Sequence, residues 1–214
     1  MFRSRLLPLA CAASLLAAPA WAADGGVPGM AHATPEMPLG VAAAALTWQP
    51  AVIADVDALI PGPPPAWKSP EWKAEMAEIL AWQQRRTADD LKAIMDWQGL
   101  PPPVRWSAEA RAAIATASLA PPRGARALAL VHAAMYDAML VTWKAKAKYR
   151  RAIPVQENPY LKPAVSEYGV PTYPSEHAAI AMAAATTMAE LFPDHKEQIL
   201  AKARLAGETR VAAG

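Results

Sequence analysis

Apolar residues recur at helical spacing from about residue 69 onward, whereas the chain before that point is rich in Pro, Gly and Ala and has little periodicity. Ser69, Pro70 and Glu71 form a helix start, with a capping serine, a proline at the first helical position and an acid in the first turn. Trp72 and Met76 then begin an apolar face. This pattern predicts an amphipathic helix from residue 70.

Two further helices are expected before residue 122. A second cap-like cluster, from Thr87 to Asp90, predicts that the first helix continues or restarts there and ends at the prolines of positions 101–103. A helix that begins at Ser107 and runs to about Leu119 should follow, and we expect the prolines at 121 and 122 to stop it. Residues 69–122 are therefore predicted to form a group of N-terminal helices.

The second half of the chain contains the longest helical pattern, over residues 124–146, with an apolar stripe along one face. Two polar residues in this helix, His132 and Asp137, could form a pair. A lone histidine on a half-apolar helix face is usually a satisfied packing residue, so we favour a structural role. An alanine-rich helix over residues 179–192 follows and is closed by Pro193.

The first 22 residues have the pattern of a secretory signal peptide. Arg3 and Arg5 precede an apolar run over residues 6–18, and residues 20–22 have the small-x-small pattern of a cleavage site. A membrane anchor is the alternative, but the run is shorter than the roughly 18 residues that a spanning helix needs, and Pro8 interrupts it. We therefore predict cleavage after Ala22 and an exported protein, periplasmic or secreted.

Composition and charge narrow the picture. The chain has 214 residues, 54% of them apolar, and its 22 prolines are about twice the usual share. They are dense in residues 23–68, which we predict to be an arm or linker. The 21 basic and 19 acidic residues nearly balance, so the chain lacks the clear basic excess of a nucleic-acid binder. The single cysteine, Cys11, lies in the leader, and no long apolar run follows it, so we expect neither disulfides nor a membrane span in the mature chain.

The clearest candidate for chemistry is Pro174-Ser175-Glu176-His177, at the start of the alanine-rich helix. A serine at this position places its hydroxyl and the first backbone N–H groups at the positive end of the helix dipole, which favours an anion. His177 lies within the first turn and can reach the same anion. A basic stretch precedes this segment, with five cations in residues 144–151.

These segments, together with Thr209-Arg210, resemble the type 2 phosphatidic acid phosphatase and vanadium-dependent haloperoxidase superfamily, in its exported bacterial branch. The family pattern is K-x6-R-P, then P-S-G-H, then S-R-x5-H-x3-D. The second motif matches with Glu176 in place of the glycine, and the resemblance covers roughly residues 124–214. It implies an all-α fold, a helical bundle of the acid phosphatase/haloperoxidase type, with a catalytic core over residues 123–214.

The first motif fits the chain in two registers. Lys144 and Arg151 have the required six intervening residues, but Ala152 stands where the proline should be. Counting from Lys146 keeps the proline, Pro154, and leaves Arg151 two residues before the arginine position of the motif. We favour Lys146 with Arg151 as the phosphate-binding pair, with Lys144 as the alternative.

The third motif is incomplete. Thr209-Arg210 matches its S-R with threonine for serine, and the histidine of the family would fall two residues beyond Gly214. The resemblance makes that histidine the nucleophile of the phosphatases and the vanadium ligand of the haloperoxidases. The simplest explanation is a truncated gene product or a fragment. We therefore expect a C-terminally incomplete bundle, and no appreciable turnover by the 214-residue chain.

The resemblance also implies roles for the residues that are present. Lys146, Arg151 and Arg210 would supply cations to a phosphate, Ser175 and nearby amides would complete the cradle, and His177 would protonate the leaving group. No metal is implied. A phosphatase would need no cofactor, whereas a haloperoxidase would hold vanadate.

Glu176 is the one residue of the second motif that does not suit an anion site, because its carboxylate would repel the ligand unless it points away. We interpret it as a favourable acid in the first turn of a helix.

Three hypotheses remain for the whole protein. The first is an exported phosphatase-like hydrolase that acts on phosphate esters through a phosphohistidine. The second is a vanadium-dependent haloperoxidase-like oxidoreductase, and the third is a helical module without catalysis.

Overall fold

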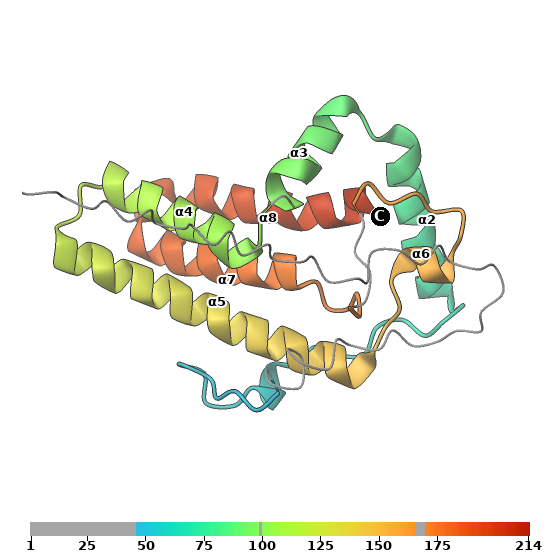
Figure 1. The fold of residues 1–214 in the computed structure, drawn as a ribbon, viewed down its shortest axis with the longest axis horizontal. Helices are drawn as coiled ribbons and strands as arrows, with labels where there is room; N and C mark the ends of the chain where they lie inside the picture. The colour runs from blue at the N-terminus through green and yellow to red at the C-terminus, as the bar shows by residue number, and fades with distance from the viewer. Residues whose placement is uncertain (1–45, 99, 166–169) are drawn as a thin grey trace, which may run out of the picture. The chain divides into compact units, whose positions relative to one another are not determined.

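Every regular element among the described residues is a helix (Figure 1). The computed structural model describes residues 46–98, 100–165 and 170–214, which belong to one unit running from His32 to Gly214. The α-helices are α2 (Pro70–Arg85), α3 (Ala88–Gln98), α4 (Pro102–Thr116), α5 (Pro121–Tyr149), α6 (Pro154–Glu157), α7 (Glu176–Leu191) and α8 (Lys196–Ala213), and the short 3-10 helices are η1 (Asp57–Leu59) and η2 (Pro193–His195). The predicted all-α fold class is confirmed.

Two proline clusters begin helices as well as ending them. α4 starts at Pro102 and α5 at Pro121, each with proline at its first positions. The N–H groups of a first helical turn have no acceptor within the helix, so a proline there forfeits no hydrogen bond, and its fixed φ suits the helix. The expected helix start at Ser107 is therefore wrong, because that residue lies inside α4, and α5 extends beyond the expected 124–146 at both ends.

Serine side chains cap the starts of α2 and α7, as the sequence predicts. The hydroxyl oxygen of Ser69 accepts the backbone N–H of Trp72 at 3.1 Å. That of Ser175 accepts the backbone N–H of Ala178 at 3.3 Å. Each cap satisfies one of the N–H groups that a helix leaves unpaired at its first turn, so these two boundaries follow from local chemistry.

A reciprocal cap restarts the chain as α3. The backbone N–H and the hydroxyl of Thr87 donate to the Asp90 carboxylate at 2.8 and 2.7 Å, and the Asp90 N–H donates to the Thr87 hydroxyl at 3.2 Å. This arrangement is a capping box in which aspartate takes the place of the usual glutamate. Of the two alternatives for this segment, a restart is the correct one.

The helix α7 packs against α5 on one side and α8 on the other (Figure 1). Its inward positions are mostly alanine, and Ala181, Ala184 and Ala185 are fully buried. Such small side chains let neighbouring helices approach closely. Gly207 of α8 shows the result, because a Cβ atom added there would lie 3.7 Å from that of Ala178. The first turn of α7 is therefore held on a tightly packed element.

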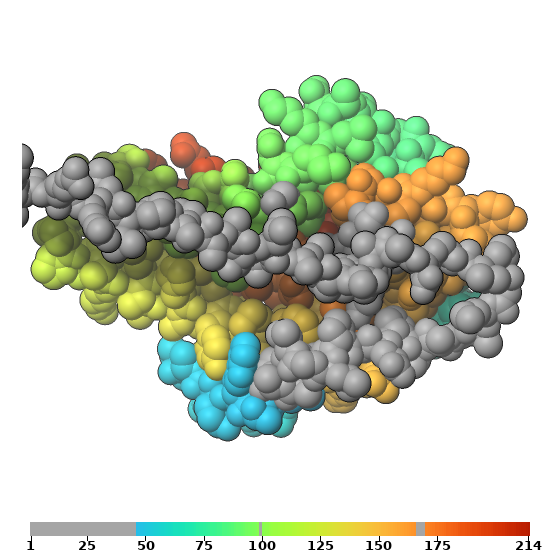
Figure 2. Space-filling view, in the orientation of Figure 1, coloured from blue at the N-terminus to red at the C-terminus, as the bar shows by residue number. Residues whose placement is uncertain are grey.

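Residues 48–62, which we call the strap, follow α5 from its middle toward its C-terminal end. In Figure 2 the first part of the strap (blue) lies against the middle of α5 (yellow). The Tyr136 hydroxyl donates to the Gln49 carbonyl at 2.9 Å, and the Tyr149 hydroxyl donates to the Pro61 carbonyl at 2.6 Å. Between these points the only regular structure is η1. This part of the predicted arm is thus attached to the helices by hydrogen bonds.

His132 and Asp137 do not pair with each other. The Asp137 carboxylate accepts the backbone N–H groups of strap residues 51–53 at 2.6, 2.8 and 3.0 Å. His132 Nε2 lies 3.1 Å from the hydroxyl oxygen of Ser107 in α4. Both residues therefore join elements of the fold, which confirms the structural role predicted for them.

The described helices also bear on the question of a membrane span. Over residues 46–98, 100–165 and 170–214, none is both long enough and apolar enough to cross a bilayer. The predicted signal peptide, residues 1–22, and the arm from 23 to 45 lie outside the described residues, so both remain predictions from the sequence.

Candidate functional site

A cavity of about 430 Å³ opens where α2, the C-terminal end of α5, the start of α7 and the C-terminal part of α8 meet. Segments around residues 151–155 and 170–175 complete its wall. The lining combines charged or polar residues with apolar ones, among them Met76, Ile79 and Val211. The cavity is therefore suited to a ligand with both a charged and an apolar portion.

Lys146 is the lysine of the basic stretch that reaches this cavity. It lies in the last turn of α5, where a cation suits the helix dipole, and only 4% of the residue is exposed. Its ammonium donates a hydrogen bond to the carbonyl of Pro171 on the facing segment. Lys144 is not among the lining residues, and its ammonium instead lies 3.7 Å from the Asp57 carboxylate of the strap.

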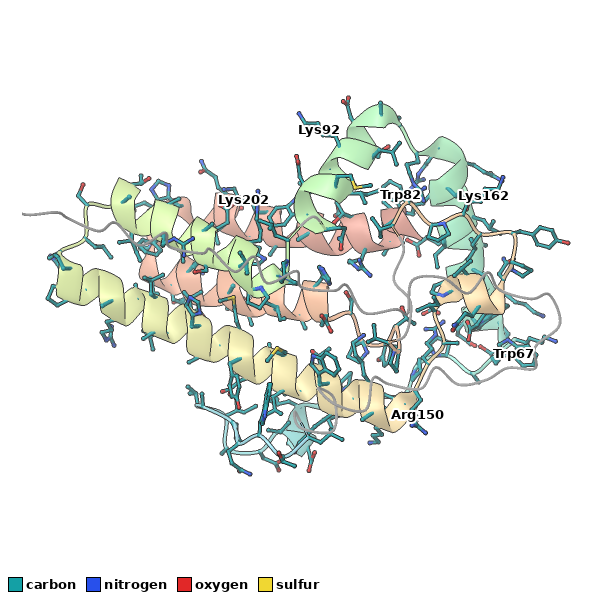
Figure 3. The ribbon with its side chains drawn as sticks, in the orientation of Figure 1. Trp67, Trp82, Lys92, Arg150, Lys162 and Lys202 are labelled. Atoms are coloured by element: carbon teal, nitrogen blue, oxygen red, sulfur yellow. The ribbon has the colours of Figure 1, made fainter. Side chains whose placement is uncertain are left out.

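The end of α5 separates two adjacent arginines. Arg150 takes a left-handed conformation, with φ 48°, and its backbone N–H donates to the carbonyl of Lys146, which ends the helix. The side chain of Arg150 is exposed at the outer end of α5 (Figure 3). The chain then turns so that Arg151 lines the cavity, with its backbone carbonyl accepting the N–H of Thr172 at 2.9 Å.

Arg151 makes an ion pair inside the cavity. Its Nη2 donates to Oε2 of Glu75, one turn into α2, at 2.6 Å. The Arg151 side chain is 11% exposed and that of Glu75 is 40% exposed, so the pair lies between the interior and the solvent. The pair binds the segment after α5 to α2.

The first turn of α7 brings Ser175 and His177 to the same cavity. Because the Ser175 hydroxyl oxygen accepts a backbone N–H as the helix cap, its own proton can donate to a ligand. Glu176 lies in this first turn, as expected for a favourable helix-start acid, and it also lines the cavity. The α7 start therefore presents a hydroxyl, an imidazole and a helix dipole to the ligand space, together with the carboxylate of Glu176, which does not lie away from the cavity.

Arg210 reaches the cavity from α8 and is positioned by α3. Its Nη1 donates to Oε1 of Gln98 at 2.5 Å, and the other end of that amide, Nε2, lies 3.4 Å from the hydroxyl oxygen of Thr209. Arg86, between α2 and α3, donates from Nε to the carbonyl of Ala212 at 2.9 Å. The C-terminal part of α8 is thus held by Gln98 of α3 and by Arg86.

The structure brings five of the six sequence-predicted site residues to one cavity, namely Lys146, Arg151, Ser175, His177 and Arg210, and leaves out Lys144. It adds residues that the sequence interpretation missed. Glu75 and Glu78 of α2 line the cavity, and Gln98 holds Arg210 from behind. The helical pattern alone carries no signal for the two acids, because Glu75 falls at the edge of the apolar face of α2 and Glu78 on its polar side.

The donor set of the cavity suits an oxyanion. Three cationic side chains, a hydroxyl group and the N-terminus of a helix all stabilise negative charge. No cluster of three or more His, Cys, Asp or Glu that could hold a metal ion occurs in the part of the chain that the structure describes. Phosphate and vanadate are both oxyanions that such donors can bind.

Comparison with known proteins supports the fold and leaves the activity open. The sequence matches no protein-family profile and no curated protein. The structure is similar to a solved bacterial vanadium-dependent iodoperoxidase, with a TM-score of 0.68 at 18% sequence identity. The match covers 77% of this chain and 48% of the other, so this chain spans about half the length of that protein. The chain therefore has the helical fold of a vanadium haloperoxidase.

Proposed function

We propose that the cavity binds the phosphate group of an organic ester, and that the protein is a phosphatase-like hydrolase of the type 2 phosphatidic acid phosphatase and haloperoxidase superfamily. One observation carries the proposal. The residues that the three family motifs single out, five in all, come from separate segments of the chain and line a single cavity. The resemblance rests on short sequence motifs, so the convergence of their residues in space is independent support.

The electrostatics of the cavity support phosphoryl transfer. Negative charge spreads over the equatorial oxygens of the phosphoryl group in the transition state, so the site needs donors that are already in place. The guanidinium groups of Arg151 and Arg210 and the ammonium of Lys146 would take this role. Ser175 would add a hydroxyl donor from the start of α7. All four are positioned by contacts within the fold before a ligand arrives.

His177 would act as the general acid. It lines the same cavity from the first turn of α7, so it can give a proton to the leaving oxygen of the ester as the phosphorus–oxygen bond breaks. The resemblance assigns the attack on phosphorus to the histidine of the third motif, which would form a phosphohistidine. We also propose that the protein is exported, because residues 1–22 have the pattern of a secretory signal peptide.

The size and lining of the cavity favour an ester over a bare anion. A volume of about 430 Å³ falls in the range of pockets for small organic ligands. Met76, Ile79 and Ile153 provide an apolar wall beside the charged residues. The organic part of the ester would pack against this wall while its phosphate meets the cations.

A haloperoxidase-like activity is the second candidate, and the fold likeness to a vanadium-dependent iodoperoxidase favours it. The same donors fit vanadate, which Lys146, Arg151, Ser175 and Arg210 would hold by charge and hydrogen bonding. Bound vanadate would supply activation of peroxide for halide oxidation.

In a protein that carries the third-motif histidine, hydrolysis of p-nitrophenyl phosphate would favour the hydrolase. Halide oxidation that requires both vanadate and peroxide would favour the peroxidase, and neither activity would indicate a non-catalytic module.

Binding of inorganic phosphate and vanadate, measured by isothermal titration calorimetry, tests the site itself. Lys146→Met should weaken both anions by about tenfold or more, because it removes a charge-assisted donor from the cavity. Lys144→Met, two residues earlier on the same helix, removes the same charge outside the cavity and should change binding less than about twofold. Equal effects of the two substitutions would show that the anion binds elsewhere.

A further inference from the structure

The ion pair between Glu75 and Arg151 occupies part of the proposed oxyanion site. Glu75 Oε2 lies 2.6 Å from Arg151 Nη2, and both residues line the cavity. A carboxylate is itself an oxyanion, so it makes with the guanidinium the kind of contact that a phosphate would make. Without a ligand, Arg151 is therefore already engaged by an acid of the chain.

The position of Glu75 is fixed by contacts on either side of it in α2. Ser69 caps the start of the helix, and the indole Nε1 of Trp72 donates to Oε2 of Glu157 at 2.7 Å, which holds α2 against α6. The next residue, Met76, is buried at 4% exposure. Glu75 follows Trp72 by about one turn, so the same helix face that contacts α6 delivers the carboxylate to Arg151.

We propose that Glu75 is an affinity- and specificity-determining residue, whose carboxylate competes with the ligand oxyanion for Arg151. The proposal rests on the oxyanion function proposed above. A ligand must displace the carboxylate from the guanidinium or bind beside its negative charge, and both lower anion affinity. Small inorganic anions have no apolar part whose packing could offset this loss. An ester has one, because its organic part can pack against the apolar wall of the cavity.

The competition is strong enough to matter because the guanidinium of Arg151 is largely shielded from solvent. With 11% of its side chain exposed, Arg151 interacts with nearby charges through the protein more than through solvent. Glu75 is 40% exposed, so its carboxylate can turn toward water once a ligand takes its place. The ion pair thus disfavours anions without blocking the cavity permanently.

Titration of inorganic phosphate into the full chain and three variants tests the proposal. Glu75→Gln should strengthen phosphate binding by about tenfold, since hydrogen bonds to charged groups are of that size. Glu75→Asp keeps the charge and should stay within about threefold of the wild type. Glu71→Gln removes the same charge from α2 outside the cavity lining and should change phosphate binding less than about twofold.

A double-mutant cycle shows whether the effect passes through Arg151. In an Arg151→Met background, Glu75→Gln should change phosphate affinity less than about twofold, because the contested group is gone. A Glu75→Gln protein that binds phosphate no better than the wild type, or more weakly, would overturn the proposal. A gain that persists in the Arg151→Met background would overturn it too, because it would place the effect of Glu75 elsewhere.

The two proposals fail in different ways. If Lys146→Met leaves phosphate binding unchanged, the oxyanion site itself is wrong. If Lys146→Met weakens binding as expected but Glu75→Gln does not strengthen it, the site stands and only the competition fails.

Phenyl phosphate serves as a further probe of specificity. The ratio of its affinity to that of inorganic phosphate should change when Met76→Ala shortens the apolar wall, whereas a purely structural role of Met76 would weaken both ligands alike.

Discussion

At the scale of single residues, buried charge is used both to hold the fold and to prepare the site. Asp137 is 3% exposed and accepts three consecutive backbone N–H groups of the strap. Arg151, at 11% side-chain exposure, is neutralised by Glu75. In both cases the burial of a charge is offset by a partner far away in the sequence, as buried charges require.

Asp137→Asn tests the first of these contacts. An asparagine can accept with one atom only, and its NH₂ group would then face N–H donors of the strap. We expect a loss of about 2–3 kcal/mol in the free energy of unfolding, because three backbone N–H donors of the strap lose a charged acceptor. Urea denaturation followed by circular dichroism measures it, with the exposed Asp96→Asn of α3 as a control near zero. Similar losses in the two variants would show that the strap adds little stability.

Contacts between residues close in the sequence could be predicted from it, whereas contacts between distant residues could not. The caps by Ser69 and Ser175 act within three residues and could be predicted from the sequence. The partner of Arg151 lies 76 positions away on α2, so no local pattern specifies it. The choice between Lys144 and Lys146 also depended on packing, since both occupy the last part of α5 and only the second reaches the cavity.

At the scale of elements, caps and prolines set the helix boundaries. A proline can mark either the end of one helix or the start of the next. A proline ends the helix before it and is also well suited to begin the next one. The sequence interpretation used the first meaning at positions 101–103 and 121–122 and therefore placed Ser107 at a helix start, whereas α4 begins at Pro102. The presence and order of α2, α3, α4, α5 and α7 were nevertheless predictable from their apolar periodicity, whereas no helix was predicted at α8 or at the short α6.

The capping box of α3 makes a prediction about acid. Hydrogen bonds from the backbone and the hydroxyl of Thr87 hold the pKa of Asp90 below its usual range. Because the folded-state pKa is lowered, the stability that Asp90 contributes is present above the ordinary pKa of about 3.9 and is lost as the pH falls through the folded value. Asp90→Asn should therefore destabilise the protein at pH 7 and flatten the decline in stability between about pH 5 and 2.5.

Urea midpoints measured over that pH range check this expectation. Asp89→Asn, one residue earlier in the same first turn, changes the charge without removing the box and serves as the matched control. If Asp89→Asn flattens the acid limb as much as Asp90→Asn does, the effect comes from total charge at the helix start and not from the cap.

At the scale of the whole molecule, the candidate site exists only in the assembled fold. Its lining comes from α2, α5, α7 and α8, and the contacts behind it involve α3 and α6. No single helix or pair of adjacent helices contains the oxyanion donors. The sequence could supply the identities of five of these donors through motifs, but their common cavity, and the acids that α2 adds to it, depend on how the helices pack.

A ligand that binds such a site must stabilise the entire fold. Inorganic phosphate at about 100 times its dissociation constant should raise the free energy of unfolding by about 2.7 kcal/mol, because it binds the native state and not the unfolded chain. Thermal unfolding monitored by circular dichroism at increasing phosphate measures this rise. Lys146→Met should lose most of it at the same concentrations. A rise of equal size in that variant would assign the stabilisation to general salt effects.

The strap also dictates an order of events while the chain is being made. Residues 51–53 leave the ribosome some 85 residues ahead of Asp137, the group that holds them. Glu75 precedes Arg151 by 76 residues, and Arg86 precedes Ala212 by 126. Contacts that close such long loops form late and slow the folding of a helical protein relative to bundles with local contacts. During synthesis, the strap and α2 can therefore make these contacts only after their partners have been made, and the cavity forms only once α8 has been synthesised.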